Sequence, residues 1–461
     1  MTDGLNTILE QGGAFEYLYK SADPLFDDLV KAINIVRGFI ETNNLIIYGG
    51  TAIDMALRLK GDHIYSEEML RIPDLDFYSP IHVEHSCALA DELYDAGFVD
   101  ARVITALHPT TMRVDIGDNH FIADVGYVPH AIFNRIPILT YNNLRIVTPT
   151  FQRMDIHLSL SFPFDGAPRE NIFGRWKKDI KRFNILDRHY PVETTGAALA
   201  TYPVKMSKAL GKYLMTGSFA YAAVYRIFVD LMERIKYEYD ASGIVPTSWS
   251  EDADTVTFDW IDDQIELITF KPEQVVAKLG TATHYEQYFN ILPERWECDK
   301  VTVYGIKHRL ISYNGVTMRV GAATTVRYTN IQYLMRHMLA CAFMSDGKRR
   351  TSYFRYYISL QSMIAEFGKA FGETDHGIKI EKSSDDLPLL PSIAVYGADN
   401  LSERGEVNMN QLMHALGKGS LWNMPRGYNA GKARENRTPH PFFDPDQLHM
   451  FRINGRVIEK D

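Results

Sequence analysis

Cysteine is scarce in this 461-residue sequence, which contains only Cys87, Cys298 and Cys341. The number is odd and no two of them show the Cys-x-x-Cys spacing, so neither a disulfide framework nor a structural zinc site is predicted, and a reducing compartment fits. Long apolar runs are also missing, since none reaches the roughly 18 residues that a membrane-spanning helix needs. The first residues, Met-Thr-Asp-Gly-Leu-Asn, lack the basic start and apolar stretch of a signal peptide. We therefore expect a soluble, cytoplasmic protein with no membrane partner.

An excess of positive charge is absent too, because the formal net charge is −9. This charge argues against a protein that coats nucleic acid by bulk attraction, but an enzyme acting on nucleic acid needs only local basic patches. Three such patches lie at residues 175–182, 348–357 and 426–437. The length predicts two or three domains, and the apolar share of 46% is that of an ordinary globular chain.

The order of apolar patterns predicts an α/β fold, in detail a mixed α+β sheet with helices on one side. Residues 24–42 carry apolar side chains at helical spacing, and residues 45–48 form a short buried strand before a glycine pair. A helix starts at Thr51 after that pair, and the next strand carries Asp74 and Asp76. The further elements expected are a helix near 83–96, strands at 99–104, 111–116 and 120–128, and helices at 147–160 and 175–186.

A second strand–glycine–helix pattern occurs at residues 213–222 and is similar in type to residues 46–54. Residues 265–269 then stand where a metal-binding strand would lie, without an aspartate pair. Either a duplicated domain that lost its metal site or a chance similarity explains the pattern. From about residue 380 the composition favours an irregular tail with loops.

The glycine pair, Gly49-Gly50, follows a strand and precedes a helix. Two residues without side chains let the backbone approach a phosphate, and the helix adds its positive N-terminal end. Thr51 would add a hydroxyl. A simple turn explains the same pattern, so the pair by itself is weak evidence for nucleotide binding.

Three aspartates stand in strand-forming, apolar surroundings: Asp74, Asp76 and Asp124. Alternate residues of a strand share one face, so Asp74 and Asp76 project together, and close carboxylates call for a divalent cation. With Asp124 they would hold two Mg²⁺ or Mn²⁺ ions and transfer a nucleoside monophosphate to a hydroxyl. Asp115 is a rival for the third position, ranked lower because Arg113 lies two residues away on the same strand.

Two basic segments have both a functional and a plain structural interpretation. Lys177, Lys178, Lys181 and Arg182 would contact a triphosphate or an RNA backbone, or form a solvated helix face. Arg349 and Arg350, followed by Tyr353, combine positive charge with a ring on which a base can stack, although aromatic residues of a core helix give the same pattern. Gly417-Lys418-Gly419-Ser420 is not a phosphate-binding loop, because the required glycine and the Lys-Ser/Thr pair are missing.

The motifs together resemble a known family. They are the segments 45–54, 73–79, 121–129, 153–163 and 174–179, and the likeness extends to Thr-Gly-Ser-Phe-Ala-Tyr at 216–221. These look like the poly(A) polymerase catalytic subunits of large nucleocytoplasmic DNA viruses, of the poxvirus and giant-virus type, within the DNA polymerase beta nucleotidyltransferase superfamily. The first motif departs from the superfamily, which mostly has Gly-Ser where this chain has Gly-Gly-Thr.

The resemblance implies roles for particular residues. Asp74, Asp76 and Asp124 would be the catalytic, metal-holding residues, and Gly49, Gly50 and Thr51 would face the triphosphate. It also implies ATP as the donor, an RNA 3′ end as the acceptor, and an inactive second nucleotidyltransferase-like domain. The expected division of the chain is a helical segment at 1–44, a catalytic domain at 45–190, the second domain at 191–380 and a tail at 381–461.

The resulting hypothesis is a metal-dependent polynucleotide adenylyltransferase in the host cytoplasm or in a virion. A nucleotidyltransferase acting on tRNA, a protein or a small molecule is the alternative within enzymes. A catalytically dead scaffold or processivity partner is the alternative outside them. A homodimer is a further expectation.

Overall fold

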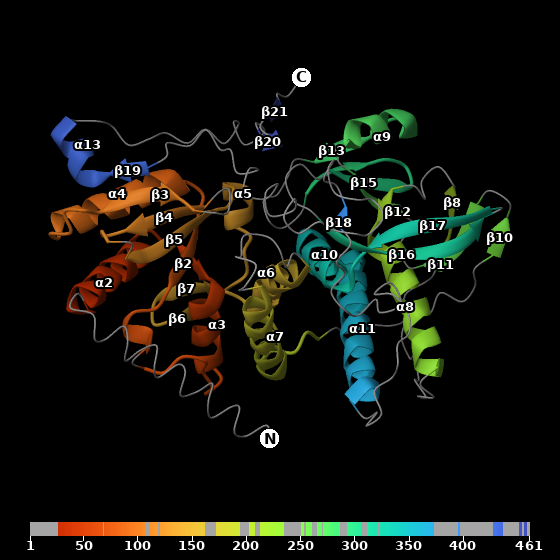
Figure 1. Ribbon diagram of the computed structural model, residues 1–461, viewed down its shortest axis with the longest axis horizontal. Helices are drawn as coiled ribbons and strands as arrows, with labels where there is room; N and C mark the ends of the chain where they lie inside the picture. Colours follow the sequence, from red (N-terminus) through yellow and green to blue (C-terminus); the bar gives the residue numbers. More distant parts are fainter. Residues whose placement is uncertain are drawn as a thin grey trace. The chain divides into compact units, whose positions relative to one another are not determined.

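The computed structural model describes part of the chain, namely residues 26–67, 69–106, 111–118, 120–161, 172–193, 202–207, 213–234, 250–252, 255–260, 265–269, 271–285, 293–305, 311–320, 322–372, 395–396, 427–436, 451–453 and 456–458. The chain divides into two compact units (Figure 1). The first draws its described residues from 1–152, 420–452 and 457–461, and the second from 153–419 and 453–456. Among the described helices, none combines the length and apolar character that crossing a membrane requires.

The first unit is built on an eight-stranded mixed sheet. Its strands, in spatial order, are β19 (Gly427–Asn429), β3 (Arg102–Thr105), β4 (Thr111–Asp115), β5 (Phe121–Tyr127), β2 (Leu75–Ser79), β1 (Ile46–Tyr48), β7 (Leu144–Val147) and β6 (Ile138–Tyr141). The pairs β2–β5 and β1–β7 are parallel, and β1–β2 is antiparallel. The expected α/β fold with a mixed sheet is therefore confirmed.

The first unit contains the following described helices. They are α2 (Phe26–Thr42), α3 (Gly49–Arg58), α4 (His82–Asp95), the short α5 (His130–Phe133) and a 3₁₀ turn at Met69–Arg71. Helix α2 begins with Asp27 and Asp28, which favour its positive N-terminal end, and it buries Ile33, Val36 and Ile40. The sequence analysis placed α2 and α4 within two residues of their observed ends. It missed the hairpin of β6 and β7.

The C-terminal part of the chain returns to the first unit. Strand β19 pairs antiparallel with β3, and helix α13 (Ala430–Asn436) follows it. Tyr428 donates to Asp91 at 2.9 Å and Arg434 to Asp95 at 2.7 Å, so this segment is fixed to helix α4 as well. Among the described residues after β19, two short strands follow, β20 (Phe451–Ile453) and β21 (Arg456–Ile458).

The second unit has a sheet of its own, also with eight strands. In spatial order they are β13 (Thr283–Tyr285), β14 (Glu294–Glu297), β15 (Val301–Gly305), β12 (Ile265–Thr269), β9 (Leu214–Met215), β17 (Ala322–Thr329), β16 (Ile311–Val320) and β18 (Val395–Tyr396). A smaller sheet joins β10 (Ser250–Asp252), β11 (Thr255–Trp260) and β8 (Tyr202–Ser207). The helices are α7 (Ile172–His189), α8 (Gly217–Arg234), α9 (Pro272–Leu279), α10 (Ile331–Met344) and α11 (Gly347–Gly372), while α6 (Pro149–Ser161) spans the division between the units.

The two large sheets repeat one order and one set of directions. Counted from β3 in the first sheet and from β13 in the second, seven strands follow in matching positions. Each two neighbouring strands that are parallel in one sheet are matched by two parallel neighbours in the other, and the same holds for antiparallel neighbours. In the first sheet Asp76 lies between Tyr48 of β1 and Asp124 of β5. In the second, the N–H of Thr216, just after β9, donates to the carbonyl of Glu266, whose partner on β15 is Thr302. Glu266 thus holds the place of Asp76. A duplicated domain predicts this agreement, and the duplication itself stays a prediction.

Candidate active site

The turn between β1 and α3 brings backbone directly under a carboxylate. Gly49 has φ +74°, a left-handed conformation that favours glycine, and it starts helix α3 instead of preceding it. A Cβ atom at this position would lie 2.5 Å from Oδ2 of Asp76. The Gly49 N–H donates to Oε1 of Gln152 at 3.0 Å. The glycine is therefore required by Asp76 as well as by the turn.

Thr51 is buried in the first turn of α3. Its hydroxyl donates to the backbone carbonyl of Asp74 at 2.7 Å. This bond fastens the segment before β2 to the helix. The hydroxyl expected to contact a phosphate is thus engaged in holding Asp74, so its contribution in this structure is positional.

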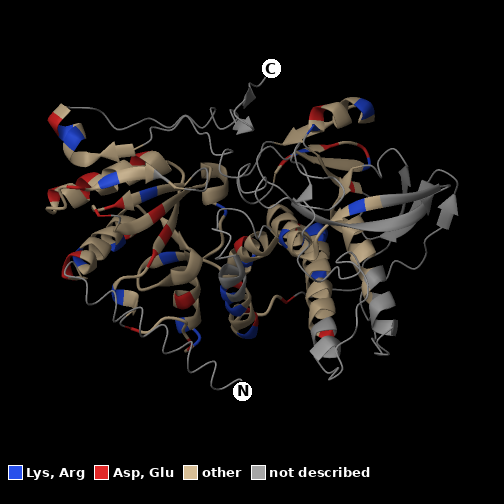
Figure 2. Ribbon diagram, viewed as in Figure 1, with Lys and Arg blue, Asp and Glu red and all other residues tan. Residues whose placement is uncertain are grey.

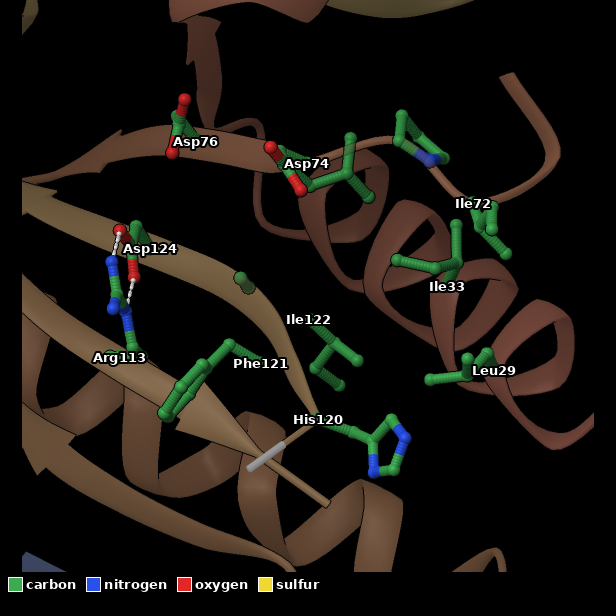
Figure 3. A pocket seen from close by; sticks show the side chains of 13 residues that line it. Leu29, Ile33, Ile72, Asp74, Asp76, Arg113, His120, Phe121, Ile122 and Asp124 are labelled. Carbon is green, nitrogen blue, oxygen red and sulfur yellow. Dashed lines mark hydrogen bonds and ion pairs between the residues drawn. The ribbon is translucent and has the colours of Figure 1, made fainter. Parts of the chain in front are cut away.

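Three carboxylates line one pocket of about 430 Å³ (Figure 3). Asp76 on β2 and Asp124 on β5 are direct partners of two parallel strands, so their side chains project from the same face. Asp74 lies two residues earlier, just outside β2, and is exposed. The structure therefore brings the three predicted residues to one pocket, from two adjacent strands.

Arg113 on β4 holds Asp124 with two hydrogen bonds. Its Nε donates to Oδ1 and its Nη2 to Oδ2, both at 2.6 Å. The hydrogen bond to Asp124 raises the pKa of Arg113 above its usual value against the opposing effect of burial, and the charges of Asp124, Asp76 and Asp74 add to the rise. The guanidinium thus lies in the negative field of all three carboxylates. A two-pronged bond of this kind fixes the orientation of the carboxylate.

The donor set fits divalent metal ions of the hard type. Carboxylate oxygens in an open pocket are ligands that Mg²⁺ and Mn²⁺ prefer. Arg113 supplies positive charge beside Asp124 from the protein itself. An ion bound by Asp124 would share that carboxylate with the guanidinium.

Asp115, the rival for the third position, is buried elsewhere. Its Oδ2 accepts from Arg102 at 3.0 Å and its Oδ1 from the Gly117 N–H at 2.6 Å. The pairing of β4 with β5 shifts register between Val114 and Asp115, which separates Asp115 from the row that contains Arg113. Arg113, whose nearness was the reason for ranking Asp115 lower, bonds to Asp124 in the structure.

The far side of the pocket is mostly apolar, with His120 as its polar member (Figure 3). Leu29 and Ile33 of α2 lie there with Ile72 and with Ile122 of β5. Phe121 stands nearer the aspartates, with the Arg113 guanidinium 4.8 Å from its ring centre. The pocket therefore combines a charged end with an apolar wall.

The predicted basic helix lies in the second unit as α7. Lys178 and Lys181 are exposed, and Arg182 is 3.9 Å from Asp179, which accepts a hydrogen bond from Ser159. The side chain of Lys177 lies outside the described residues. Figure 2 shows Lys and Arg recurring along α7. A solvated face and a polyanion contact both fit this arrangement.

Helix α11 separates the charged and aromatic residues of the third predicted group. Arg349 and Arg350 are exposed at its start, but Tyr353 is buried with Tyr356 and Tyr357 in the core of the second unit. A nucleic-acid base cannot stack on a ring that the protein already covers. The predicted stacking role of Tyr353 does not fit the structure, because the tyrosines face the core and only the two arginines reach solvent.

Two residues of the site escaped the sequence analysis in these roles. Gln152 binds the glycine turn from a helix about a hundred residues later in the chain, and Arg113 binds Asp124 from the neighbouring strand. Neither contact leaves a local pattern in the sequence. The sequence shows only that Arg113 stands two residues before Asp115 on one strand. The structure pairs Arg113 with Asp124 instead.

Comparisons with known proteins place these features among viral proteins. The profile of the family "Poly(A) polymerase catalytic subunit" matches residues 34–166. A protein of African swine fever virus, provisionally named a poly(A) polymerase catalytic subunit, is 32% identical over 342 residues, which cover 72% of this chain and 70% of that protein. A mimivirus protein of the same name is 26% identical over 35% of this chain and 26% of its own length. The crystal structure of the Megavirus polyadenylate synthase matches in fold with a TM-score of 0.56 at 20% identity, over 83% of this chain and 76% of that one.

Proposed function

The chain belongs to the poly(A) polymerase catalytic subunit family, and from this premise we propose that it adds AMP from ATP to RNA 3′ ends. The resemblance expected from the motifs is thereby confirmed at the level of the family. The observation that carries the chemical part of the proposal is the convergence of Asp74, Asp76 and Asp124 on one pocket beside the glycine turn.

The carboxylates have defined tasks in this reaction. Asp76 and Asp124, with Asp74, would hold two divalent ions of the Mg²⁺ or Mn²⁺ type. Such ions, when bound, lower the pKa of the attacking 3′-hydroxyl and neutralise charge on the triphosphate. Arg113 orients Asp124, and the Thr51 hydroxyl fixes the backbone of Asp74. Both contacts keep the carboxylates in place before the substrate arrives.

The start of helix α3 supports triphosphate binding. Gly49 and Gly50 form its first turn and add no side chains of their own, while Gln152 accepts from the Gly49 N–H. A helix N-terminus is a favourable place for phosphate because its amide groups and dipole are positive. Lys177 and Lys178 remain proposed contacts of the triphosphate, and Lys181, Arg182, Arg349 and Arg350 remain proposed contacts of RNA.

Primer extension tests the reaction. The protein is incubated with an RNA primer, Mg²⁺ or Mn²⁺, and each nucleoside triphosphate in turn. We expect long ladders with ATP alone. A product on tRNA, protein or a small molecule without extension of the primer would support the alternative acceptor, and a protein that neither extends nor binds Mn²⁺ would be the inactive scaffold.

Substitution of the carboxylates tests the site. Asp76→Asn keeps the shape of the side chain and removes its charge. Replacing a residue that only hydrogen-bonds to a metal ligand lowers activity by up to about 100-fold, so the loss of a proposed ligand should lower the extension rate by more than that. Asp74→Ala and Asp124→Asn should act likewise. Asp27→Asn changes an exposed aspartate at the start of α2 and should leave the rate unchanged. Normal extension by Asp76→Asn would refute the assignment.

Three further expectations stay predictions. They are the inactive second nucleotidyltransferase-like domain, the homodimer, and a location in the host cytoplasm or the virion. The repeated strand order supports the first of them.

A further inference from the structure

A second group of ligand-type side chains lies at the corresponding place of the other large sheet. Glu266 on β12 and His337 and Cys341 on α10 bring one carboxylate oxygen, Nε2 and Sγ within 4.8 Å of one another. All three residues are buried, with at most 2% of each exposed. Glu266 is the residue that holds the place of Asp76 in the strand order.

Local structure explains why these side chains meet. His337 and Cys341 are four residues apart on α10, so they share one face of the helix. Gly217 has φ +61°, and a Cβ atom there would lie 1.7 Å from Oε2 of Glu266. A glycine at the start of a helix thus lies under a carboxylate in this unit too, as Gly49 lies under Asp76. In this unit the carboxylate is buried.

Three ligand-type atoms lie close to one another in this group. Nε2 of His337 lies 3.0 Å from Oε1 of Glu266 and 3.5 Å from Sγ of Cys341. A single N–H on Nε2 can point at only one of them. Burial by itself would lower the pKa of His337, but Cys341 and Glu266 raise it well above its usual value. The observation that bears on a metal ion is geometric, since a carboxylate oxygen, a ring nitrogen and a sulfur converge on one buried place.

Tyr304 completes the surroundings as a donor. Its hydroxyl donates to Oε1 of Glu266 at 2.8 Å, and burial first of all raises the pKa of Tyr304, so the phenol stays protonated. Hydrogen bonds of this kind orient the carboxylates that bind metals. Burial opposes ionisation of Glu266, but His337, Tyr304 and Arg349 outweigh it and lower the pKa of Glu266.

We propose that Glu266, His337 and Cys341 bind a Zn²⁺ ion that joins helix α10 to strand β12. Nitrogen, sulfur and carboxylate oxygen are the zinc ligands of proteins, and tetrahedral geometry with ordinary bond lengths separates N and S ligands by about 3.5 Å. The separation of Nε2 and Sγ is 3.5 Å. The second oxygen of Glu266 or a water molecule would complete the four ligands.

Charge balance supports the ion. The carboxylate of Glu266 and a thiolate of Cys341 together neutralise Zn²⁺, which suits a buried site. Binding releases two protons to solvent, one from the Cys341 thiol and one from Nε2 of His337, because both ligand atoms must be deprotonated. The ligand set mixes sulfur and nitrogen with oxygen and is closed to solvent, in contrast to the open oxygen ligands of Asp74, Asp76 and Asp124. Such a site is structural. The absence of Cys-x-x-Cys spacing does not exclude it, because only one ligand is a cysteine.

Metal content tests the proposal. The full chain is expressed in zinc-supplemented medium, freed of any tag, and its zinc measured by elemental analysis. We expect about one Zn²⁺ per chain. Cys341→Ser should retain less than about a tenth of the zinc. Replacing a residue that only hydrogen-bonds to a metal ligand already lowers metal affinity about tenfold, and replacing the ligand itself should lower it more. Cys298→Ser, a buried cysteine of the same unit outside the group, is the matched control and should retain the metal.

A second measurement covers the case in which Cys341→Ser does not fold. The wild-type chain expressed with Co²⁺ in place of zinc should show the near-ultraviolet absorption of a cobalt–thiolate bond, and Cys298→Ser should show the same band. Wild-type protein without stoichiometric metal, or equal metal in Cys341→Ser, overturns the proposal and leaves a proton-linked pair of Glu266 and His337. Primer extension is scored separately, so zinc without extension would count against the proposed function alone.

Discussion

Gly49→Ala separates the two demands that the structure makes at the glycine turn. The added methyl group must adopt φ +74°, which costs an L-residue about 1–2 kcal/mol. It must also share space with Oδ2 of Asp76, 2.5 Å from the Cβ position. The carboxylate is the end of a flexible side chain, so we expect it to rotate away while the sheet stays intact.

The matched control is Gly61→Ala. Gly61 has nearly the same conformation, φ +78°, but a Cβ atom there meets nothing within 4 Å. Both variants should therefore lose about 1–2 kcal/mol of unfolding free energy. Only Gly49→Ala should lose activity, by about 100-fold, the effect of a displacement of about 1 Å at a reacting centre.

The assay combines urea unfolding with single-turnover primer extension at saturating ATP. Equal stability losses with a rate loss confined to Gly49→Ala would support the reasoning. If Gly49→Ala extended RNA as fast as Gly61→Ala, the position of Asp76 above the turn would have no part in catalysis.

Two further predictions follow from the described contacts. Arg113→Lys keeps the charge but not the two-pronged bond to Asp124, so the extension rate should fall about tenfold with little change in melting temperature; an unchanged rate would show that the fork is dispensable. Burial lowers the pKa of His157 from its usual 6.5 to about 4. Below pH 6.5 His157 is therefore protonated in the unfolded chain and stays neutral in the folded chain. The free energy of unfolding falls as the pH drops toward 4. Urea unfolding at pH 7.5 and pH 5.0 measures this effect. Over that range the free energy of unfolding of His157→Gln should fall by about 2 kcal/mol less than that of the wild type, and equal falls would contradict the lowered pKa.

Local patterns were sufficient for the elements that build the catalytic sheet. Helix α2 and the strand after Asp74 were predictable because their apolar spacing is regular and their ends carry polar or glycine residues. The hairpin of β6 and β7 was missed although Asn142 and Asn143, with φ 46° and 65°, are the residues that such a two-residue turn favours.

Contacts between distant segments were not predictable from one sequence. The bond between Arg113 and Asp124 depends on which strands are neighbours, and the burial of Tyr353 depends on which face of α11 meets the core. Likewise, the pairing of β19 with β3 joins residues more than 300 positions apart. Pattern reasoning identified the carboxylates because their chemistry is local, and it failed where the partner was remote.

Strand β19 has a consequence for the order in which the protein can be completed during synthesis. It is the edge strand of the first sheet, yet residues 153–419, most of the second unit, are translated before it. Until Gly427–Asn429 leaves the ribosome, the edge of β3 presents unpaired backbone groups, the kind of edge that favours pairing with other chains. A chain released before β19 would carry all three aspartates of the pocket and still have an open edge at β3, so a segment distant in the sequence closes the first sheet.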